Sequence, residues 1–467
     1  MGARAVLASA HDLASRRVLQ PLQRVERRVR PGARPALHAY EAGLAFRDGA
    51  VAWDDDRRRA WILARLRETA RRACAESAFY RARFEAAGVD PRADFGFEEF
   101  ARLAPLTRED LRAQGAALVS RALPPAQLWR DATGGSTGEP TQVWLGPEER
   151  GWQESGNEHY MRRLGVPRGS RTTYLWGHHL DPVARESWRE RVRDFADNVR
   201  WLDCFRLSPA VLERYHAALE RHRPARLVAY ASALATLAEE VLARGWQPGY
   251  PTRCCVTGAE RLTAAQRTLV RAAFGRPVHA RYGSRDAGLV AFQVDPEASG
   301  YEVDWANTLV EPLDAGPVAP IVLTKLHGDG MPMLRYRVGD LGQFPAGSRP
   351  GHPVFALDDV LGRELDRLWL GDGRWVHGLE LPHLMKDHAV REFQVVQGAD
   401  LSVVVHVVPG AGFGPGQARR ILATLADNLP GLPLRLEVVE TIARTPAGKL
   451  RPVVSHAAAS PTAEGVR

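Results

Sequence analysis

The sequence predicts an α/β protein with a large N-terminal domain, built on a parallel sheet core with a barrel-like subdomain, and a small C-terminal α+β domain. Its 467 residues are about three times the ~150 residues of a common domain, which excludes a single small binding module. Short apolar runs alternate with helical patterns from residue 170 to 292, and shorter strands with Gly and Pro turns follow residue 300. Such alternation is typical of a parallel sheet with crossover helices.

The chain is predicted to begin with a helical extension over residues 1–56. The Arg-rich composition of residues 1–40 also fits a transit peptide, but in a chain that is Arg-rich throughout we favour a partly ordered helical extension. Residues 57–88 carry apolar side chains at three- and four-residue intervals, which predicts an amphipathic helix that ends at Gly88, before Pro91.

The large domain is predicted to span residues 57–362. Its expected parallel strands are TTYLW (172–176), RLVAY (226–230), RCCVTG (253–258) and VHARYG (278–283). The helices expected between them cover residues 184–199, 208–222, 231–244 and 263–274. Later strands of the barrel-like subdomain are expected in APIVLTKL (319–326), MPMLRYRVGD (331–340) and HPVFALDD (352–359).

The C-terminal domain is predicted over residues 363–455. Two strands, REFQVVQG (391–398) and LSVVVHVVP (401–409), precede a helix near 415–428 and a third strand, LRLEVVE (434–440). Residues 456–467 are rich in Ala, Ser, Pro and Thr and are predicted to form a flexible tail.

Charge and composition exclude several classes of protein. The net charge is +8, and the 63 basic residues comprise 60 Arg and only three Lys, at positions 325, 386 and 449. Because the Arg are interleaved with Asp and Glu, a salt-bridged surface is favoured over a nucleic-acid-binding stripe. Cys254 and Cys255 lie in an apolar run and are predicted to be buried, reduced thiols. With no apolar segment that could span a membrane and no signal peptide pattern, we predict a cytoplasmic protein.

The most distinctive motif is TGGSTGEP at residues 133–140. Its glycines free the backbone to turn and its hydroxyls offer donors, so such a loop can wrap phosphate oxygens. It is not a Walker A loop, since no Gly-Lys-Ser/Thr follows, and a plain polar turn is the alternative. The candidate phosphate-binding residues are Thr133, Gly134, Gly135, Ser136, Thr137 and Gly138.

This motif resembles the phosphate loop of adenylate-forming enzymes, the superfamily of acyl-CoA synthetases and adenylation domains. Further stretches match that family in order: GAE at 258–260, YGSRDAG at 282–288, RYRVGD at 335–340, GRELD at 362–366 and RTPAGK at 444–449. Residues 75–91, 103–111 and 202–238 are similar to the phenylacetate-CoA ligase branch, in particular to its capsular-polysaccharide-type (CapK) members. Six motifs in this order are hard to obtain by chance.

The resemblance implies a reaction in two steps. ATP and a small-molecule carboxylate would give an acyl adenylate and pyrophosphate, and a nucleophile, with CoA as the leading acceptor, would then take the acyl group. Lys449 follows Gly448 where the family places its adenylation lysine. Its ammonium could contact both the attacking carboxylate and the α-phosphate, whereas the alternative is an exposed surface lysine.

The family pattern also implies a nucleotide site and a mobile C-terminal domain, with the active site between the two domains. Asp340 would accept hydrogen bonds from the ribose hydroxyls, unless it only caps a turn, and Arg363 would approach ribose or phosphate. Asp366 would be the hinge, although many relatives place that Asp one residue earlier, where this chain has Leu365. The implied adenine pocket comprises Gly258, Ala259, Glu260, Tyr282 and Gly283, with the Tyr ring stacked on the base.

Two departures from the family concern metals. Asp286 stands where the family usually has Glu, and Arg285 where it often has Thr. Asp286 could hold Mg2+ through its shorter side chain, or it could instead form an ion pair with Arg285. Some relatives carry Cys and His, a zinc site, just after this motif, but residues 291–303 contain neither, and we expect no structural zinc.

The acyl pocket is the least defined part of the predicted site. Trp176, His178 and His179 fall where relatives line this pocket, but core or loop packing remains an alternative for each of them. An amine or a carrier-protein thiol also stays open as the acceptor, in secondary metabolism or polysaccharide decoration. A degenerate nucleotide-binding regulator is a further alternative, which Asp286 and Arg285 favour and Lys449 and the phosphate loop oppose.

Overall fold

The computed structural model describes residues 33–133, 141–177, 194–195, 197–204, 207–298, 300–363, 367–372, 375–377, 380–385, 388–410, 412–444 and 450–457. The chain forms two compact units, each with a hydrophobic core of its own. Unit 1 comprises Met1–Val338 and Gly342–Val360, and unit 2 comprises Gly339–Leu341 and Leu361–Arg467.

Helices form the first part of unit 1. They are α3 (Ala33–Ala50), α4 (Asp55–Glu76), α5 (Ala78–Ala86), α6 (Phe97–Phe100) and α7 (Arg108–Gln114), followed by the 3-10 turns η2 (Gly115–Leu118) and η3 (Pro125–Gln127). The single helix predicted over residues 57–88 is wrong in one respect, because Ser77 is extended and separates α4 from α5. Serine favours helix ends because its side chain competes for backbone hydrogen bonds. The break lets α5 turn Tyr80 and Phe84 into the core.

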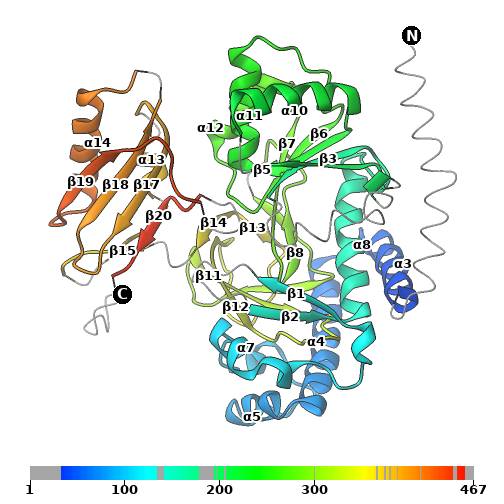
Figure 1. Cartoon of the computed structure of the whole chain (residues 1–467). Coiled ribbons are helices and arrows are strands. Elements are labelled where there is room, and N and C mark those ends of the chain that lie inside the picture. The colour runs from blue at the N-terminus through cyan, green and yellow to red at the C-terminus, as the bar shows by residue number, and fades with distance from the viewer. Residues whose placement is uncertain are drawn as a thin grey trace. The chain divides into compact units, whose positions relative to one another are not determined.

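An eight-stranded sheet is the centre of unit 1 (Figure 1). Its strands are β3 (Thr172–Trp176), β4 (Val199–Asp203), β5 (Arg226–Tyr230), β6 (Cys254–Gly258), β7 (Val278–Ser284), β8 (Gly288–Phe292), β9 (Tyr301–Val303) and β13 (Ala356–Leu357), in the order β13-β9-β8-β7-β6-β5-β3-β4. The strands from β4 to β7 run parallel, which confirms the predicted parallel core. The strands beyond β7 pair antiparallel.

Four of the predicted strands in this sheet are confirmed, while β4 was not predicted. The helix expected over residues 184–199 is wrong at its end, because Val199 begins β4, and residues 178–193 lie outside the described residues. Asn198, immediately before β4, has a φ of 57°, a left-handed conformation that Asn tolerates and that interrupts a helix. A helical periodicity therefore cannot continue into this segment.

Helices cover both faces of the parallel strands (Figure 1). On one face lie α10 (Pro209–His222), α11 (Ala231–Ala243) and α12 (Ala264–Phe274), which begin and end close to the predicted bounds. On the other face, Tyr160 and Met161 of α8 (Pro147–Arg163) pack against sheet residues such as Val228 and Val256. Cys254 and Cys255 are buried free thiols, as predicted.

Two smaller sheets are formed by strands outside the eight-stranded sheet. The strands β1 (Trp129–Thr133) and β2 (Thr141–Leu145) form an antiparallel hairpin. A four-stranded sheet has the order β10-β11-β12-β14, with β10 (Thr308–Pro312), β11 (Val318–Lys325), β12 (Tyr336–Gln343) and β14 (Asp359–Arg363).

Unit 2 is a small α+β structure. Its elements are β15 (Arg367–Trp369), β16 (Trp375–His377), α13 (Glu380–Met385), β17 (Val390–Gln397), β18 (Val403–Pro409), α14 (Pro415–Asn428), β19 (Leu434–Val438) and β20 (Val453–Ser455). The buried valines of β18 alternate with partly exposed positions and pack against Ile421 and Leu425 of α14. The short strand β20, which pairs parallel with β17, was not predicted.

Within the described ranges, no helix has the length and apolar character that crossing a membrane would require.

Candidate functional site

The predicted phosphate loop connects the two strands of a hairpin. Thr133, the last residue of β1, is paired with Thr141, the first residue of β2. Arg112 of α7 donates to the Thr141 hydroxyl at 3.1 Å, which ties the base of the hairpin to a helix. Residues 134–140 lie outside the described residues, so Gly134, Gly135, Ser136, Thr137 and Gly138 remain predictions.

The GAE motif follows the carboxyl end of β6. Gly258 ends the strand, and Ala259 has a φ of 67°, a left-handed conformation that is uncommon for a residue with a Cβ and is often found at functional sites. The Glu260 carboxylate accepts a 2.8 Å hydrogen bond from the backbone N–H of Ser232, in the first turn of α11. Its other oxygen is buried without a partner in the part of the chain that is described. Glu260 therefore keeps a free acceptor beside the helix N-terminus.

The YGSRDAG motif forms the β7–β8 hairpin. Tyr282 is half-buried and packs against the main core. A Cβ at Gly283 would collide with the carbonyl oxygen of Gly288 across the hairpin, so the close approach of the two strands requires glycine there.

Asp286, in the turn of this hairpin, is buried with an exposed fraction of only 2%. The Tyr336 hydroxyl donates a 2.7 Å hydrogen bond to its carboxylate. Burial raises the pKa of Tyr336, which keeps the hydroxyl protonated as a donor. The alternative ion pair between Asp286 and Arg285 is wrong, because Arg285 instead lies 3.6 Å from the Asp131 carboxylate. Residue spacing alone does not show this choice of partners.

The surroundings of Asp286 limit how it could bind magnesium. The described residues contain no group of three or more His, Cys, Asp and Glu that could hold a metal ion. A single carboxylate fits Mg2+ when nucleotide phosphates and water supply the remaining oxygens. Asp286 therefore fits as one ligand of an ion that ATP brings, on condition that its hydrogen bond to Tyr336 leaves an oxygen free.

Asp340 and Arg363 are brought together at neighbouring strands. Asp340 lies in β12 and Arg363 ends β14, which is adjacent to β12 in the sheet. The Arg363 Nε lies 3.3 Å from the Asp340 Oδ1. The sequence resemblance assigned each to the nucleotide separately, and only the strand order shows that they form an ion pair.

Trp176 lies at the carboxyl end of β3, with its ring 4.4 Å from the ring of Tyr230 in an edge-on arrangement. The guanidinium of Arg281 lies over the same indole, 5.4 Å from the ring centroid. Arg281 was not identified as a site residue from the sequence. Its position as a charged residue between the apolar VHA run and Tyr282 could have indicated it.

Four further predicted site residues fall outside the described ranges and remain predictions. They are His178, His179, Asp366 and Lys449.

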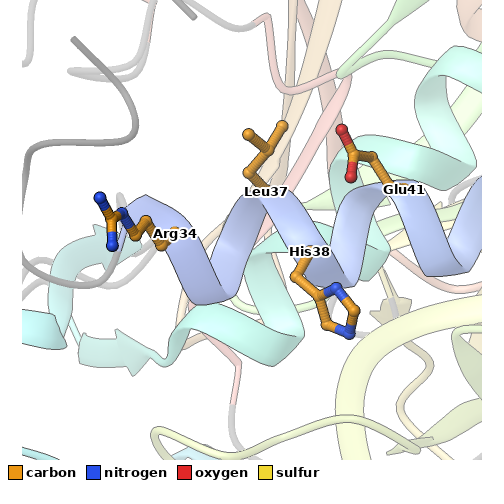
Figure 2. A pocket seen from close by; sticks show the side chains of 4 residues that line it. All are labelled: Arg34, Leu37, His38 and Glu41. Carbon is orange, nitrogen blue, oxygen red and sulfur yellow. The ribbon is translucent and has the colours of Figure 1, made fainter. Parts of the chain in front are cut away.

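A pocket of about 330 Å³ lies along α3 and is lined by Arg34, Leu37, His38 and Glu41 (Figure 2). None of these residues belongs to the motifs above, and they share one helix of the N-terminal segment. We therefore do not include this pocket in the candidate site.

Comparisons with known proteins agree with the predicted family. No family model matches the chain. A phenylacetate-coenzyme A ligase of Thermus thermophilus is 27% identical over 278 residues, which are 56% of this chain. The match spans 60% of the length of that ligase.

Solved structures share the fold over most of the chain. A 2-hydroxyisobutyryl-CoA ligase, solved in the postadenylation state in complex with R3-HIB-AMP, superposes with a TM-score of 0.66 at 20% identity, covering 86% of this chain and 90% of that one. The amide bond synthetase McbA of Marinactinospora thermotolerans gives a TM-score of 0.52 at 20% identity, covering 72% of this chain and 70% of that one. The predicted α/β fold with a C-terminal α+β domain is thereby confirmed, whereas the CapK branch stays a prediction. The chain is thus similar in sequence to a phenylacetate-coenzyme A ligase, and it shares its fold with a CoA ligase and an amide bond synthetase.

Proposed function

We propose that this protein activates a small-molecule carboxylic acid with ATP and then transfers the acyl group to CoA. The observation that carries the proposal is that Trp176, Gly258 and Tyr282 lie at or near the carboxyl ends of β3, β6 and β7, which are parallel strands of one sheet. In open α/β sheets, ligands bind outside the carboxyl ends of the strands.

The residues of unit 1 supply a site for the base of ATP. Tyr282 offers an aromatic face to the adenine ring, and Glu260 has one carboxylate oxygen without a hydrogen-bond partner among the described residues. The predicted loop that begins at Thr133 would enclose the phosphates through its backbone N–H groups.

The ribose is assigned to Asp340. Arg363 contacts this carboxylate, so it would orient the Asp340 side chain toward the ribose hydroxyls. Arg363 would therefore act on the ribose mainly through Asp340.

The chemistry follows from these positions. A substrate carboxylate oxygen would bond to the α-phosphorus of ATP as the bond to the bridging oxygen breaks, and pyrophosphate would leave. The CoA thiolate would then attack the acyl carbon, and AMP would leave with the electron pair of the broken bond. Lys449 would stabilise negative charge at the α-phosphate. Magnesium, bound with the nucleotide, would supply charge neutralisation of the phosphates.

The test is acid-dependent exchange of pyrophosphate into ATP, across a panel of aromatic, aliphatic and amino acids. Lys449→Ala should lower the exchange rate by roughly 100-fold or more, since loss of one such contact costs about 3 kcal/mol in the transition state. Lys386→Ala is the matched control and should exchange like wild type. The Lys449 variant should still transfer an acyl group from a supplied adenylate. Wild-type exchange in Lys449→Ala would contradict the assignment.

The acceptor is decided by a second screen. CoA is the expected acceptor, and the screen includes free amines and a carrier-protein thiol as alternatives. If no acid supports exchange in the wild-type protein, the catalytic proposal fails and the degenerate-regulator alternative gains support. We also propose a cytoplasmic location, supported by four cysteines that are all free thiols.

A further inference from the structure

Arg281 is in register with the strand residues beside the proposed acyl pocket. Tyr230 is paired with Gly258, and Thr257 with Ala280, so Arg281 lies one residue beyond, level with Gly258. In a parallel sheet, residues at one level place their side chains on one face. Leu175 of β3 is paired with Ala229 of β5, so the next residue, Trp176, lies beside Tyr230 and continues the same row.

Contacts confirm that these side chains share that face. A Cβ at Gly258 would lie 3.0 Å from the Arg281 Nε and 3.5 Å from the Trp176 ring. Gly258 therefore leaves the space that the Arg281 side chain occupies, with its guanidinium over the indole. The row ends at the carboxyl ends of β3 and β6, where this fold binds ligands.

The charge of Arg281 has no acidic partner among the described residues. By contrast, two other arginines of unit 1 that are buried pair with carboxylates, Arg47 with Asp304 at 2.9 Å and Arg335 with Glu311 at 3.0 Å. Burial lowers the pKa of Arg281, against an opposing effect of Tyr174, and Arg226 nearby lowers it further. A half-buried guanidinium in this setting is stabilised by an anion, and its planar fork matches a carboxylate in two parallel hydrogen bonds.

We propose that Arg281 is a specificity-determining residue that binds a second carboxylate of the substrate, separate from the one that is activated. The protein is then a ligase for dicarboxylic acids. This inference rests on the proposed function, because it requires that the acid bind beside Trp176. It goes further by naming the class of acid that the pocket selects.

The first test uses the wild-type protein and matched pairs of acids: butyrate with succinate, hexanoate with adipate, and phenylacetate with 4-carboxyphenylacetate. In pyrophosphate exchange, the dicarboxylate of at least one pair should have a kcat/KM on the order of 10- to 100-fold higher. This comparison needs no variant, so it does not depend on how a substitution folds. Preference for the monocarboxylate in every pair overturns the proposal.

The second test replaces Arg281. Arg281→Met keeps a long side chain over Trp176 but removes the charge, and it should lower kcat/KM for the dicarboxylate by about 10-fold or more, mainly through KM. The same variant should leave the monocarboxylate unchanged or improved. Arg281→Lys should retain part of the preference, because an ammonium keeps the charge but lacks the fork. Arg253→Met, an exposed residue just before the other end of β6, is the control and should behave like wild type.

The outcomes separate the two proposals. If none of the acids supports pyrophosphate exchange, the proposed function is contradicted. Exchange with equal losses for both members of a pair in Arg281→Met would show that Arg281 holds the activated carboxylate or the pocket wall, and it would overturn the dicarboxylate inference alone. Calorimetric binding of the dicarboxylate to wild type and Arg281→Met, with a non-reacting ATP analogue in place of ATP, gives a readout that is independent of turnover.

Discussion

Asp286 has two candidate roles: its carboxylate accepts a hydrogen bond from the buried Tyr336, and we propose that it also binds Mg2+. The hydrogen bond from Tyr336 links the β7–β8 hairpin to β12, the strand that carries Asp340. A metal role and a structural role of Asp286 therefore predict different effects of Asp286 and Tyr336 variants on the metal dependence and the stability.

If Asp286 is a magnesium ligand, Asp286→Asn should raise the Mg2+ concentration needed for half-maximal pyrophosphate exchange, because a neutral amide oxygen is a poorer ligand. Asp286→Glu should keep the metal dependence, although the extra methylene in a buried site should lower stability by about 1–3 kcal/mol. Tyr336→Phe should lower the free energy of unfolding by about 1–3 kcal/mol and leave the metal dependence unchanged. If Asp286→Asn shows the metal dependence of wild type, Asp286 is structural.

Asp340 should be essential for ATP affinity. Asp340→Ala is expected to weaken ATP binding about tenfold or more, which corresponds to ~1.4 kcal/mol, within reach of one charge-assisted contact. Calorimetric titration with ATP measures the effect. Asp358→Ala, which removes an exposed carboxylate just before β14, is the control. An Asp340 variant with wild-type ATP affinity would assign this residue to turn capping.

At the scale of elements, the contact between α3 and α8 joins the N-terminal segment to the large sheet. Both helices are brought close by small residues: a Cβ at Gly151 of α8 would lie 2.5 Å from the Ala36 carbonyl oxygen of α3. Next to this contact, Arg47 of α3 forms a buried ion pair with Asp304, at 2.9 Å. The helix is thus part of the fold of unit 1.

Gly151→Ala should therefore destabilise the protein. The added methyl group forces the two backbones apart, and overpacking of this kind costs about 1–3 kcal/mol. Gly49→Ala, in α3, is the matched control, since a Cβ there meets nothing within 4 Å; it should be neutral or stabilising by about 0.5–1 kcal/mol. Urea unfolding of both variants measures the difference, and equal effects would show that the helices can move apart freely.

A buried charged cluster between α4, α8 and the β11–β12 connection should make stability depend on pH. The His327 Nδ1 lies 3.0 Å from the Arg65 guanidinium and 3.2 Å from the Glu148 carboxylate of α8, and the His327 Nε2 lies 3.0 Å from the Ala306 carbonyl oxygen. The guanidinium and the carbonyl oxygen favour the neutral ring with its proton on Nε2, whereas the Glu148 carboxylate favours the charged ring. Burial lowers the pKa of His327 to about 4 from 6.5. The unfolded chain therefore takes up a proton at a higher pH than the folded chain does.

His327 should consequently favour unfolding as the pH falls from 6.5 toward 4, by about 3 kcal/mol at most. Glu149 acts in the opposite direction over part of this range, because burial raises its pKa to about 7 although Lys325 lies 2.6 Å away. The measurement is therefore a difference between variants in urea unfolding at several pH values. His327→Gln should lose less stability than wild type between pH 6.5 and 4, whereas His38→Gln, at an exposed position of α3, should follow wild type. Parallel curves for His327→Gln and wild type would contradict this assignment.

At the scale of the whole molecule, the two units have separate cores. A cavity made by substitution in one core should therefore lower the stability of that unit. Leu66 in unit 1 and Ile421 in unit 2 are both fully buried. Replacing either with Ala should cost about 2–5 kcal/mol through lost burial and the cavity left behind. In scanning calorimetry, Ile421→Ala should lower one unfolding transition and Leu66→Ala another. A single transition that both variants shift equally would show that the units unfold together.

Much of the architecture could be predicted from local patterns. The strands β3, β5, β6 and β7 and the helices α10 to α12 lie close to their predicted positions, because apolar periodicity over several residues reflects which face is buried. Short or interrupted elements could not be predicted this way. The three residues of β20 are too few to show a period, and the break at Ser77 depends on packing of α5 against the core.

The sequence by itself indicated the fold class and a resemblance to adenylate-forming enzymes, since six motifs occur along the chain in the order of that family. Only the tertiary structure decided which side chains act as partners. It pairs Asp286 with Tyr336 instead of Arg285, joins Asp340 to Arg363, and sets Arg281 beside Trp176 and Gly258 without an acid to balance it. The physical reason is that these partners are distant in sequence and meet through strand register and burial, which no local pattern records.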